Sequence, residues 1–598
     1  MVIALAPLLI AACATAPDYA EPLPTRQEVV ERTIQERIER GESSRAIQRL
    51  KGLDENTLPG DRFEVLWSEA VAGIEREFEQ HVSDGDWEQA VAAYRSLRTL
   101  AEHSSQSDDA RAFEEREASD WDLNELYIAW ADSYREEDNE VAALNLFLKA
   151  PRFAESPEED LIEYGRLAVE QNHRFAVESV ISALDDRDLE IPESLTDYVT
   201  SRTEISDMLV GTATVEVDRG IRIRDGVGQR DQVMGSGFFI DKRGYLVTNY
   251  HVIRSEVDPK HDGYSRLYIR LSENPSQRIP ARVVGYDRIL DVALVKAEVD
   301  PQYVFSLTDV RELRPGATVY AMGSPGGLSS SISSGIISAT GRRYLQLGEA
   351  MQIDAGLNPG NSGGPVVNES GQLVGVAFAG IPQFENVNFA VPSLWIQHIV
   401  PRLYQGNEVR HSWMGASVHE RRGSLEVKYI LPNSPAHEAG LKVGDSITAI
   451  DGAEVGTLAE AQELMLERQR GSLIRVDWTR DGSERNGLLA LAERPHNPVL
   501  EAVDKDVETA VLAPLFGMTV RELSRGIFRT NYTIERVFSG GIADETGLSP
   551  QDPFALQDLI IDEDRGVAIL RISVRQRKAG FMTRGIQLAS LLEIDNFI

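Results

Sequence analysis

The sequence contains almost no cysteine, few positive charges for its length, and no long apolar run beyond its first residues. Cys13 is the only cysteine among 598 residues, so no internal disulfide can form. After residue 13, no run approaches the ~20 apolar residues that a membrane-spanning helix requires. The net charge of −34 argues against a nucleic-acid-binding protein, because such proteins present basic surfaces. The 10 histidines show no paired ligand spacing, so we expect no metal site.

Residues 1–13 are predicted to be a lipoprotein-type signal peptide. They are apolar and end in LIAAC, which resembles the lipobox of bacterial lipoproteins, whose cysteine is acylated. The positive charge that normally precedes such a stretch is lacking, so either the true start lies upstream or the signal is atypical. The alternative is a buried cysteine in an ordinary helix. With residues 14–26 as a linker, we expect a lipid anchor at Cys13 on a membrane-bound protein of the bacterial cell envelope, facing the periplasm or the exterior.

Residues 27–200 show the apolar spacing of helices, and a chain of 598 residues predicts several domains. A small residue followed four positions later by a bulky one recurs at Ala46/Leu50, Ala90/Tyr94, Ala143/Phe147 and Ala176/Val180. Predicted turns precede these pairs at residues 41–42, 84–86, 137–139 and 171–172. The array resembles tetratricopeptide repeats, although its spacing is irregular. We expect it either to contact a protein partner or to act as a spacer.

The helical region is also the most acidic part of the chain. Residues 101–200 hold 27 Asp and Glu against 8 Lys and Arg. This imbalance predicts either a well-solvated helical surface or an acidic docking face for a basic partner.

Ser362 lies in the glycine-rich stretch GNSGG at residues 360–364. Glycines there can present a serine on a tight turn whose backbone N–H groups face an oxyanion. The alternative is a Gly-Ser surface turn. It is less favoured because the two residues that a serine nucleophile requires, a base and a partner for that base, are present upstream. His251 follows an apolar strand-like segment, and Asp291 opens an alternating apolar run. The order His251, Asp291, Ser362 is that of chymotrypsin-like proteases.

Three motifs carry a resemblance to the HtrA/Deg family of trypsin-like serine proteases. They are TNYHV at 248–252, DVALV at 291–295 and DAGLNPGNSGGP at 354–365, and the similarity extends over residues 205 to 495. The resemblance implies an all-β double barrel at residues 205–403 with the catalytic residues in the cleft between the barrels. It also implies an endopeptidase of the cell envelope that needs no cofactor and forms homotrimers.

The resemblance assigns a role to each catalytic residue. Ser362 would attack the scissile carbonyl, His251 would carry the proton, and Asp291 would hold the imidazole. Backbone N–H groups of Gly360 and Ser362 would bind the oxyanion. Substrate would contact Leu357, Asn358, Asn388, Phe389 and Ala390. The family usually has Gly or Ser where this chain has Asn388, so the chain departs here from the pattern that accompanies the family's preference for small aliphatic residues before the cut.

Residues 410–494 resemble a PDZ domain. Trp413, Met414, Gly415 and Ala416 match the carboxylate-binding loop, which captures a peptide C-terminus while the peptide adds a strand to the sheet. A divergent PDZ-like copy is predicted at residues 510–598, after a linker at 497–509, and whether it binds peptide is open.

Two functions follow from these observations. The first is an active envelope serine endopeptidase that cleaves unfolded or specific envelope proteins, with PDZ and helical domains that select substrates or regulate cleavage. The alternative is a peptide-binding holdase scaffold whose protease domain is largely latent.

Overall fold

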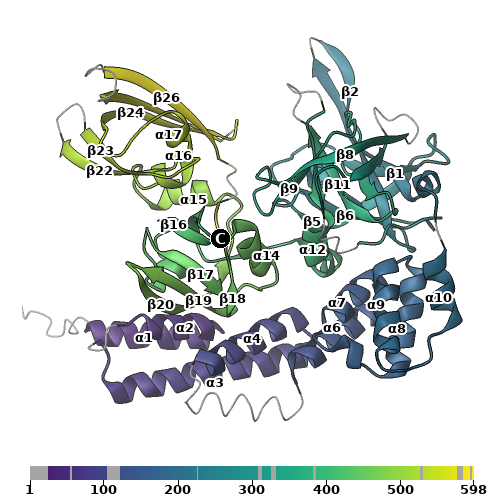
Figure 1. Cartoon of the computed structure of the whole chain (residues 1–598), viewed down its shortest axis with the longest axis horizontal. Helices are drawn as coiled ribbons and strands as arrows, with labels where there is room; N and C mark the ends of the chain where they lie inside the picture. The colour runs from purple at the N-terminus through teal and green to yellow at the C-terminus, as the bar shows by residue number, and fades with distance from the viewer. Residues whose placement is uncertain are drawn as a thin grey trace, which may run out of the picture.

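The computed structural model describes residues 25–598 except for 54–56, 104–120, 202, 225, 308–312, 325–330, 381–385, 526–529, 564, 576–582 and 593–595. It shows a helical region, a two-barrel domain and two PDZ domains in chain order (Figure 1). Cys13 lies outside the described residues, so the lipid anchor stays a prediction. Within the described ranges, every helix is too short or too polar to span a lipid bilayer.

The helical region is built from antiparallel helix pairs. Its elements are α1 (Arg26–Glu39), α2 (Ser43–Lys51), α3 (Gly60–Asp84), α4 (Trp87–His103), α6 (Leu123–Glu136), α7 (Glu140–Lys149), the 3₁₀ helix η1 (Phe153–Glu155), α8 (Glu158–Glu170), α9 (Arg174–Asp185) and α10 (Glu193–Thr200). Each of the four predicted turns joins two helices. Both members of all four small-and-bulky pairs are at most 1% exposed, because each small residue leaves room for a neighbouring helix. The helical character is confirmed, and the likeness to tetratricopeptide repeats stays a prediction.

The two-barrel domain follows. Its elements are η2 (Ile205–Gly211), β1 (Thr212–Arg224), β2 (Val227–Asp241), β3 (Tyr245–Thr248), α11 (Tyr250–Val257), β4 (Arg266–Leu271), β5 (Ile279–Asp287), β6 (Val292–Ala297), β7 (Thr318–Gly323), β8 (Ser331–Arg342), β9 (Ala350–Ile353), β10 (Pro365–Asn368), β11 (Leu373–Gly380), β12 (Asn388–Pro392), α12 (Ser393–Gln405) and β13 (Asn407–Glu408). The first sheet has the order β13-β5-β4-β1-β2-β3-β6 and closes through β5 and β6. The second is a closed barrel in the order β10-β11-β12-β9-β8-β7. The predicted double barrel is confirmed.

Each PDZ domain contains one main sheet. The first has β14 (Ser412–Trp413), β15 (Ala416–Arg421), β16 (Ser424–Ile430), α13 (Pro435–Glu438), β17 (Ser446–Ile450), β18 (Ala453–Glu454), α14 (Leu458–Leu466), β19 (Leu473–Arg480), β20 (Ser483–Ala490) and β21 (Ala492–Glu493). The second has α15 (Pro498–Lys505), α16 (Leu512–Phe516), β22 (Met518–Arg525), β23 (Thr530–Val537), α17 (Ile542–Glu545), β24 (Pro553–Asp562), β25 (Val567–Arg575) and β26 (Thr583–Leu591). The sheet orders are β15-β16-β17-β19-β20 and β22-β23-β24-β25-β26.

The boundaries of the second PDZ domain differ from the predicted range of 510–598. The predicted linker at 497–509 contains α15, because Asn497 accepts hydrogen bonds from the first turn and Pro498 suits the first helical position. Val499 and Ala502 are fully buried in the core of this domain. At the other end, residues 596–598 leave the second domain and pair with the open edge of β15 in the first, where Phe597 is opposite Ser417. The letter C in Figure 1 accordingly lies over the first PDZ domain.

The helical region runs along one side of the molecule, beneath the first PDZ domain and the two-barrel domain (Figure 1). Gln48 is 2% exposed, donates to Pro435 O (2.6 Å) and accepts from Ala490 N (2.8 Å). Tyr134 Oη donates to Pro401 O (2.6 Å) in α12. One surface of the predicted partner-binding region therefore contacts other domains of the same chain.

Candidate active site

His251 is held by both oxygens of the Asp291 carboxylate. Its Nδ1 lies 2.7 Å from Asp291 Oδ2, and its backbone N–H donates to Asp291 Oδ1 at 2.8 Å. His251 is in the first turn of α11, directly after β3, so strand and helix together fix its backbone. The side chain is 46% exposed, which leaves the ring accessible to a substrate.

Asp291 occupies a turn between β5 and β6 with a φ of 55°, a left-handed conformation that Asp adopts more readily than most residues. Its backbone oxygen accepts from Asn249 Nδ2 at 2.8 Å and from Tyr250 N at 3.2 Å. Asp287 Oδ1 holds the same turn from its other end, since it accepts from Ile289 N and Leu290 N. The turn is thus hydrogen-bonded on both sides of the carboxylate.

The pairing changes the acidity of His251. Desolvation by the surrounding protein would lower the pKa of the imidazole, because burial disfavours its charged form. The hydrogen bond to Asp291 and the charge of that carboxylate outweigh this effect and raise the pKa above its usual value. The site therefore stabilises an imidazolium, the form that a general base becomes when it takes a proton.

The turn that carries Ser362 is held by a residue that the motifs did not single out. Ser236 Oγ donates to Gly360 O at 2.6 Å and accepts from Ser324 N at 2.9 Å. Ser236 N donates to Ser362 O at 2.7 Å. A Cβ on the neighbouring Gly235 would lie 3.1 Å from Ser362 O. The sequence signal for this contact is GSG within a strand, since glycine in a strand often marks close backbone approach.

The structure brings His251 and Asp291 into contact, whereas the Ser362 hydroxyl points elsewhere. Ser362 Oγ donates to Phe378 O at 3.3 Å, and among the described residues it makes no hydrogen bond to His251. The hydroxyl must therefore rotate toward the imidazole before it can lose its proton. Catalytic hydrogen bonds are often long or misaligned in proteins without substrate.

Gly360 and Gly363 shape the backbone around the serine. Their φ angles are 108° and 88°, in a region that residues with side chains rarely adopt. A Cβ on Gly363 would lie 2.2 Å from Ser236 O, so only glycine fits there.

The five residues that were predicted to contact substrate differ in their exposure to solvent. Asn358 is exposed and Leu357 half-buried beside the catalytic turn. Asn388 is 7% exposed and donates from Nδ2 to Ala355 O at 2.9 Å. Phe389 is 4% exposed and stacks on Tyr344 with ring centroids 4.4 Å apart. Ala390 is fully buried in the core of the second barrel.

The backbone of β12 is paired along both edges, with β11 and with β9. A substrate backbone therefore cannot add to this strand as a further strand, and contact of substrate with Asn388, Phe389 or Ala390 stays a prediction. Among the described residues, β11 pairs with β10 only through its residues from Leu373 to Val376. Residues 378–380 of β11 extend beyond this pairing beside Ser362, and this edge was missed because strand pairing is not visible in a motif.

The predicted carboxylate-binding loop lies at the start of the first PDZ sheet. Trp413 and Met414 are buried, and Gly415 has a φ of 82°. Backbone N–H groups of Gly415 and Ala416 donate to the backbone oxygen of Ile598 at 2.9 and 3.2 Å. The loop therefore binds peptide backbone, here that of residues 596–598 of the same chain. Across the residues that the structure describes, no group of three or more side chains could hold a metal ion.

Comparison with known proteins agrees with this geometry. Family models match a trypsin-like peptidase domain at residues 235–376, a PDZ domain at 412–490, a TP0546 family PDZ domain at 499–592 and a domain of unknown function (DUF8517) at 27–119. A probable periplasmic serine endoprotease DegP-like of Marinomonas sp. (strain MWYL1) is 31% identical over 345 residues, which cover 54% of this chain and 70% of that protein. The chain belongs to the DegP-like serine endoproteases.

A second DegP-like relative shows similar agreement. The relative from Pseudomonas fulva (strain 12-X) is 30% identical over 346 residues, 54% of this chain and 70% of that protein. A solved structure of the HtrA-type protease AlgW with decapeptide has 24% identity and a TM-score of 0.41 over 49% of this chain and 98% of its own. This DegP-like protein is a serine endopeptidase of the cell envelope, and both of its predicted PDZ domains are confirmed.

Proposed function

We propose that this DegP-like protein cleaves envelope proteins through Ser362, His251 and Asp291. The observation that carries the proposal is the two-point contact between Asp291 and His251, which fixes the imidazole tautomer and orientation. The Nδ1 hydrogen bond leaves Nε2 as the nitrogen that can take a proton from the serine.

The proposed reaction is acyl transfer to water. Ser362 Oγ, rotated from Phe378 O toward His251 Nε2, loses its proton to the imidazole and attacks the scissile carbonyl. The imidazolium, stabilised by Asp291, then protonates the leaving amine. Water repeats the sequence on the acyl-enzyme and releases the product.

We assign the oxyanion site to the backbone N–H groups of Gly360 and Ser362. Removing one such donor in comparable sites costs about 3–4 kcal/mol of transition-state stabilisation. We further propose that the substrate backbone pairs with residues 378–380 of β11, which among the described residues extend beyond the register with β10. Leu357 and Asn358, which precede the Ser362 turn in the chain, would contact the same substrate, and Phe389, whose ring centroid lies 6.3 Å from that of Phe378, would support β11.

Three further proposals concern partners and location. The lipid anchor at Cys13 would hold the enzyme at a membrane, the helical region would present its acidic face to a basic protein, and the chain would assemble as a trimer. These follow from the sequence and from the family resemblance. The helical region's contacts with α12 and the first PDZ domain support a role in arranging the catalytic domains.

The test is cleavage of an unfolded protein such as casein by the chain lacking residues 1–13, with a fluorophosphonate probe as a second readout. We expect both turnover and labelling, each dependent on Ser362. If the protein suppresses aggregation of casein but neither cleaves it nor reacts with the probe, the holdase scaffold replaces the protease. The Ser362 hydroxyl that points away from His251 is the observation that favours this second function.

A further inference from the structure

The groove of the first PDZ domain is occupied by residues 596–598 of the same chain, which we call the tail. The tail runs antiparallel to β15, and Phe597 is opposite Ser417. Ile598 O accepts from Gly415 N and Ala416 N, Ile598 N donates to Ala416 O at 2.9 Å, and Val418 N donates to Asn596 O at 2.8 Å. This is the pattern of a peptide that adds a strand to a sheet edge.

Each side chain of the tail contacts a different part of the first PDZ domain. Ile598 is 3% exposed and belongs to the hydrophobic core of the first PDZ domain. Phe597 is 1% exposed, with its ring centroid 6.1 Å from that of Trp413 and 6.2 Å from that of Tyr429. Asn596 Oδ1 accepts from Ser417 Oγ at 2.6 Å. The groove thus contacts all three residues of the tail through both backbone and side chains.

We propose that the tail is an intramolecular ligand of this groove, and that it defines the peptides that can replace it. Such a peptide ends in an aliphatic residue that fills the place of Ile598. An aromatic residue precedes it, between Trp413 and Tyr429, and a hydrogen-bond acceptor precedes that, opposite Ser417. This inference rests on the proposed role of residues 413–416 as a peptide site.

The attachment of the tail makes it a strong competitor. Leu592, four residues before Asn596, is 2% exposed in the core of the second PDZ domain. The tail is therefore tethered closely to its groove. A short tether gives an effective concentration on the order of millimolar, and tethering changes apparent affinity by about 100-fold or more. A peptide from another protein must overcome this advantage before it can bind.

The occupied groove also contacts the two-barrel domain through one side chain. Gln462 in α14 is 1% exposed, donates from Nε2 to Phe597 O at 3.4 Å and accepts at Oε1 from Gly348 N at 2.9 Å. Gly348 lies between β8 and β9, in the same connection as Tyr344, which stacks on Phe389. Exchange of the tail for another peptide therefore takes place next to a residue that also binds the second barrel.

The decisive experiment measures binding of a fluorescent decapeptide ending in Asn-Phe-Ile by polarisation, to the chain lacking residues 1–13. We expect removal of residues 596–598 to tighten binding by about 100-fold. Ile598→Ala keeps the rest of the tail and should give an intermediate affinity. Leu591→Ser is the matched control, because Leu591 is 64% exposed on β26, and it should bind like the parent chain.

Two results overturn the proposal in distinguishable ways. Equal affinity of the parent and the tail-deleted chain means that the tail does not occupy the groove, although residues 413–416 still bind peptide. No binding by either chain means that the groove is not a peptide site, and the proposed role of the loop fails with it. A second readout is trimming by carboxypeptidase, which saturating peptide should accelerate in the parent chain if it displaces the tail.

Discussion

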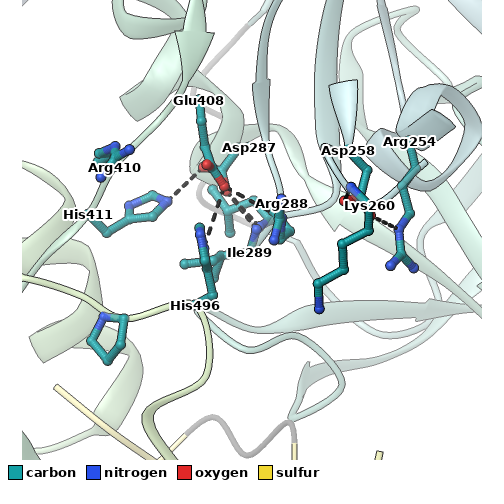
Figure 2. Close-up of polar contacts among 12 residues, drawn as sticks. Arg254, Asp258, Lys260, Asp287, Arg288, Ile289, Glu408, Arg410, His411 and His496 are labelled. Carbon is teal, nitrogen blue, oxygen red and sulfur yellow. Dashed lines mark hydrogen bonds and ion pairs between the residues drawn. The ribbon is translucent and has the colours of Figure 1, made fainter. Parts of the chain in front are cut away.

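His411 Nε2 lies 2.8 Å from Asp287 Oδ2, across the boundary between the first PDZ domain and the two-barrel domain (Figure 2). Their side chains are 2% and 0% exposed. The other oxygen of Asp287 accepts from Ile289 N and Leu290 N, the two residues that precede Asp291. A residue at the start of the PDZ domain therefore holds the turn that presents the Asp291 carboxylate.

From this contact we expect His411 to act as a positioning residue for catalysis. His411→Ala leaves a buried carboxylate with one partner fewer, which costs about 1–3 kcal/mol. A shifted Asp291 turn should lower kcat/KM by about 10- to 100-fold, mostly through kcat, because small displacements of catalytic groups are costly. The measurement is steady-state cleavage of a short reporter peptide, together with thermal unfolding.

Two variants separate positioning from general damage at the domain boundary. His411→Gln retains an N–H donor that can reach Asp287 and should restore most of the activity. His496→Ala removes a histidine of the same boundary that is 56% exposed and 3.5 Å from Glu408, and should leave activity unchanged. Equal losses in His411→Gln and His411→Ala would argue against the positioning role.

Ser362→Ala should abolish proteolysis and fluorophosphonate labelling while leaving the fold intact, since only one oxygen is lost. The expected loss is on the order of 10⁶ in kcat, and His251→Ala should be comparably severe because such residues act as a unit. Ser370→Ala, at an exposed serine of the same barrel, is the control. Cleavage by Ser362→Ala near the parent rate would refute the assignment of the nucleophile.

The acidic limb of the pH profile should lie above the usual pKa of histidine, about 6.5. Proteolysis needs neutral His251, and Asp291 raises its pKa, so activity is lost at higher pH than with a free imidazole. Asp291→Asn removes the charge and should move this limb to lower pH while reducing kcat by about 10⁴. Asp300→Asn, at an exposed position, should leave the profile unchanged. An unshifted limb in Asp291→Asn would contradict the pairing.

Gln48→Ala should loosen the contact between the helical region and the first PDZ domain. It leaves Pro435 O and Ala490 N without the partner that Gln48 provides, at a cost of about 1–3 kcal/mol for each buried group. Gln27→Ala removes an exposed glutamine of α1 and should have little effect. Thermal unfolding and limited proteolysis measure the difference, and equal stability of the two variants would show that this contact is not formed.

Cys13→Ser should release the protein from membranes or block its processing, because acylation at that residue would supply the anchor. Ala14→Ser keeps the cysteine and is the matched control. Fractionation of cells that express each variant gives the measurement. Equal membrane association of the parent and Cys13→Ser would remove the lipoprotein interpretation.

Part of the proposed catalytic site could be predicted from the sequence because the backbone conformations around its residues are local. The glycines of GNSGG permit the backbone angles around Ser362, and a strand that ends in TNYHV places His251 at the start of a helix. The helix pairs were equally predictable, since a turn and a small residue opposite a bulky one are both short-range features. Each of these signals lies within about ten neighbouring residues.

Contacts between distant segments left no signal in the sequence that identifies the partner. Ser236 binds Gly360 across 124 positions, Asn596 meets Ser417 across 179, and Gln48 reaches Ala490 across 442. β12 was expected to contact substrate, and the motif gave no sign that both of its edges pair with other strands, which excludes a substrate strand beside it.

The sequence by itself determined which residues are candidates for cutting a peptide bond and roughly which domain each belongs to. Only the tertiary structure decided how the strands pair around Ser362, which domain anchors the Asp291 turn, and what fills the PDZ groove. The physical reason is that backbone conformation depends on neighbours along the chain. Burial and hydrogen-bond pairing depend instead on neighbours in space, which folding brings together from hundreds of residues apart.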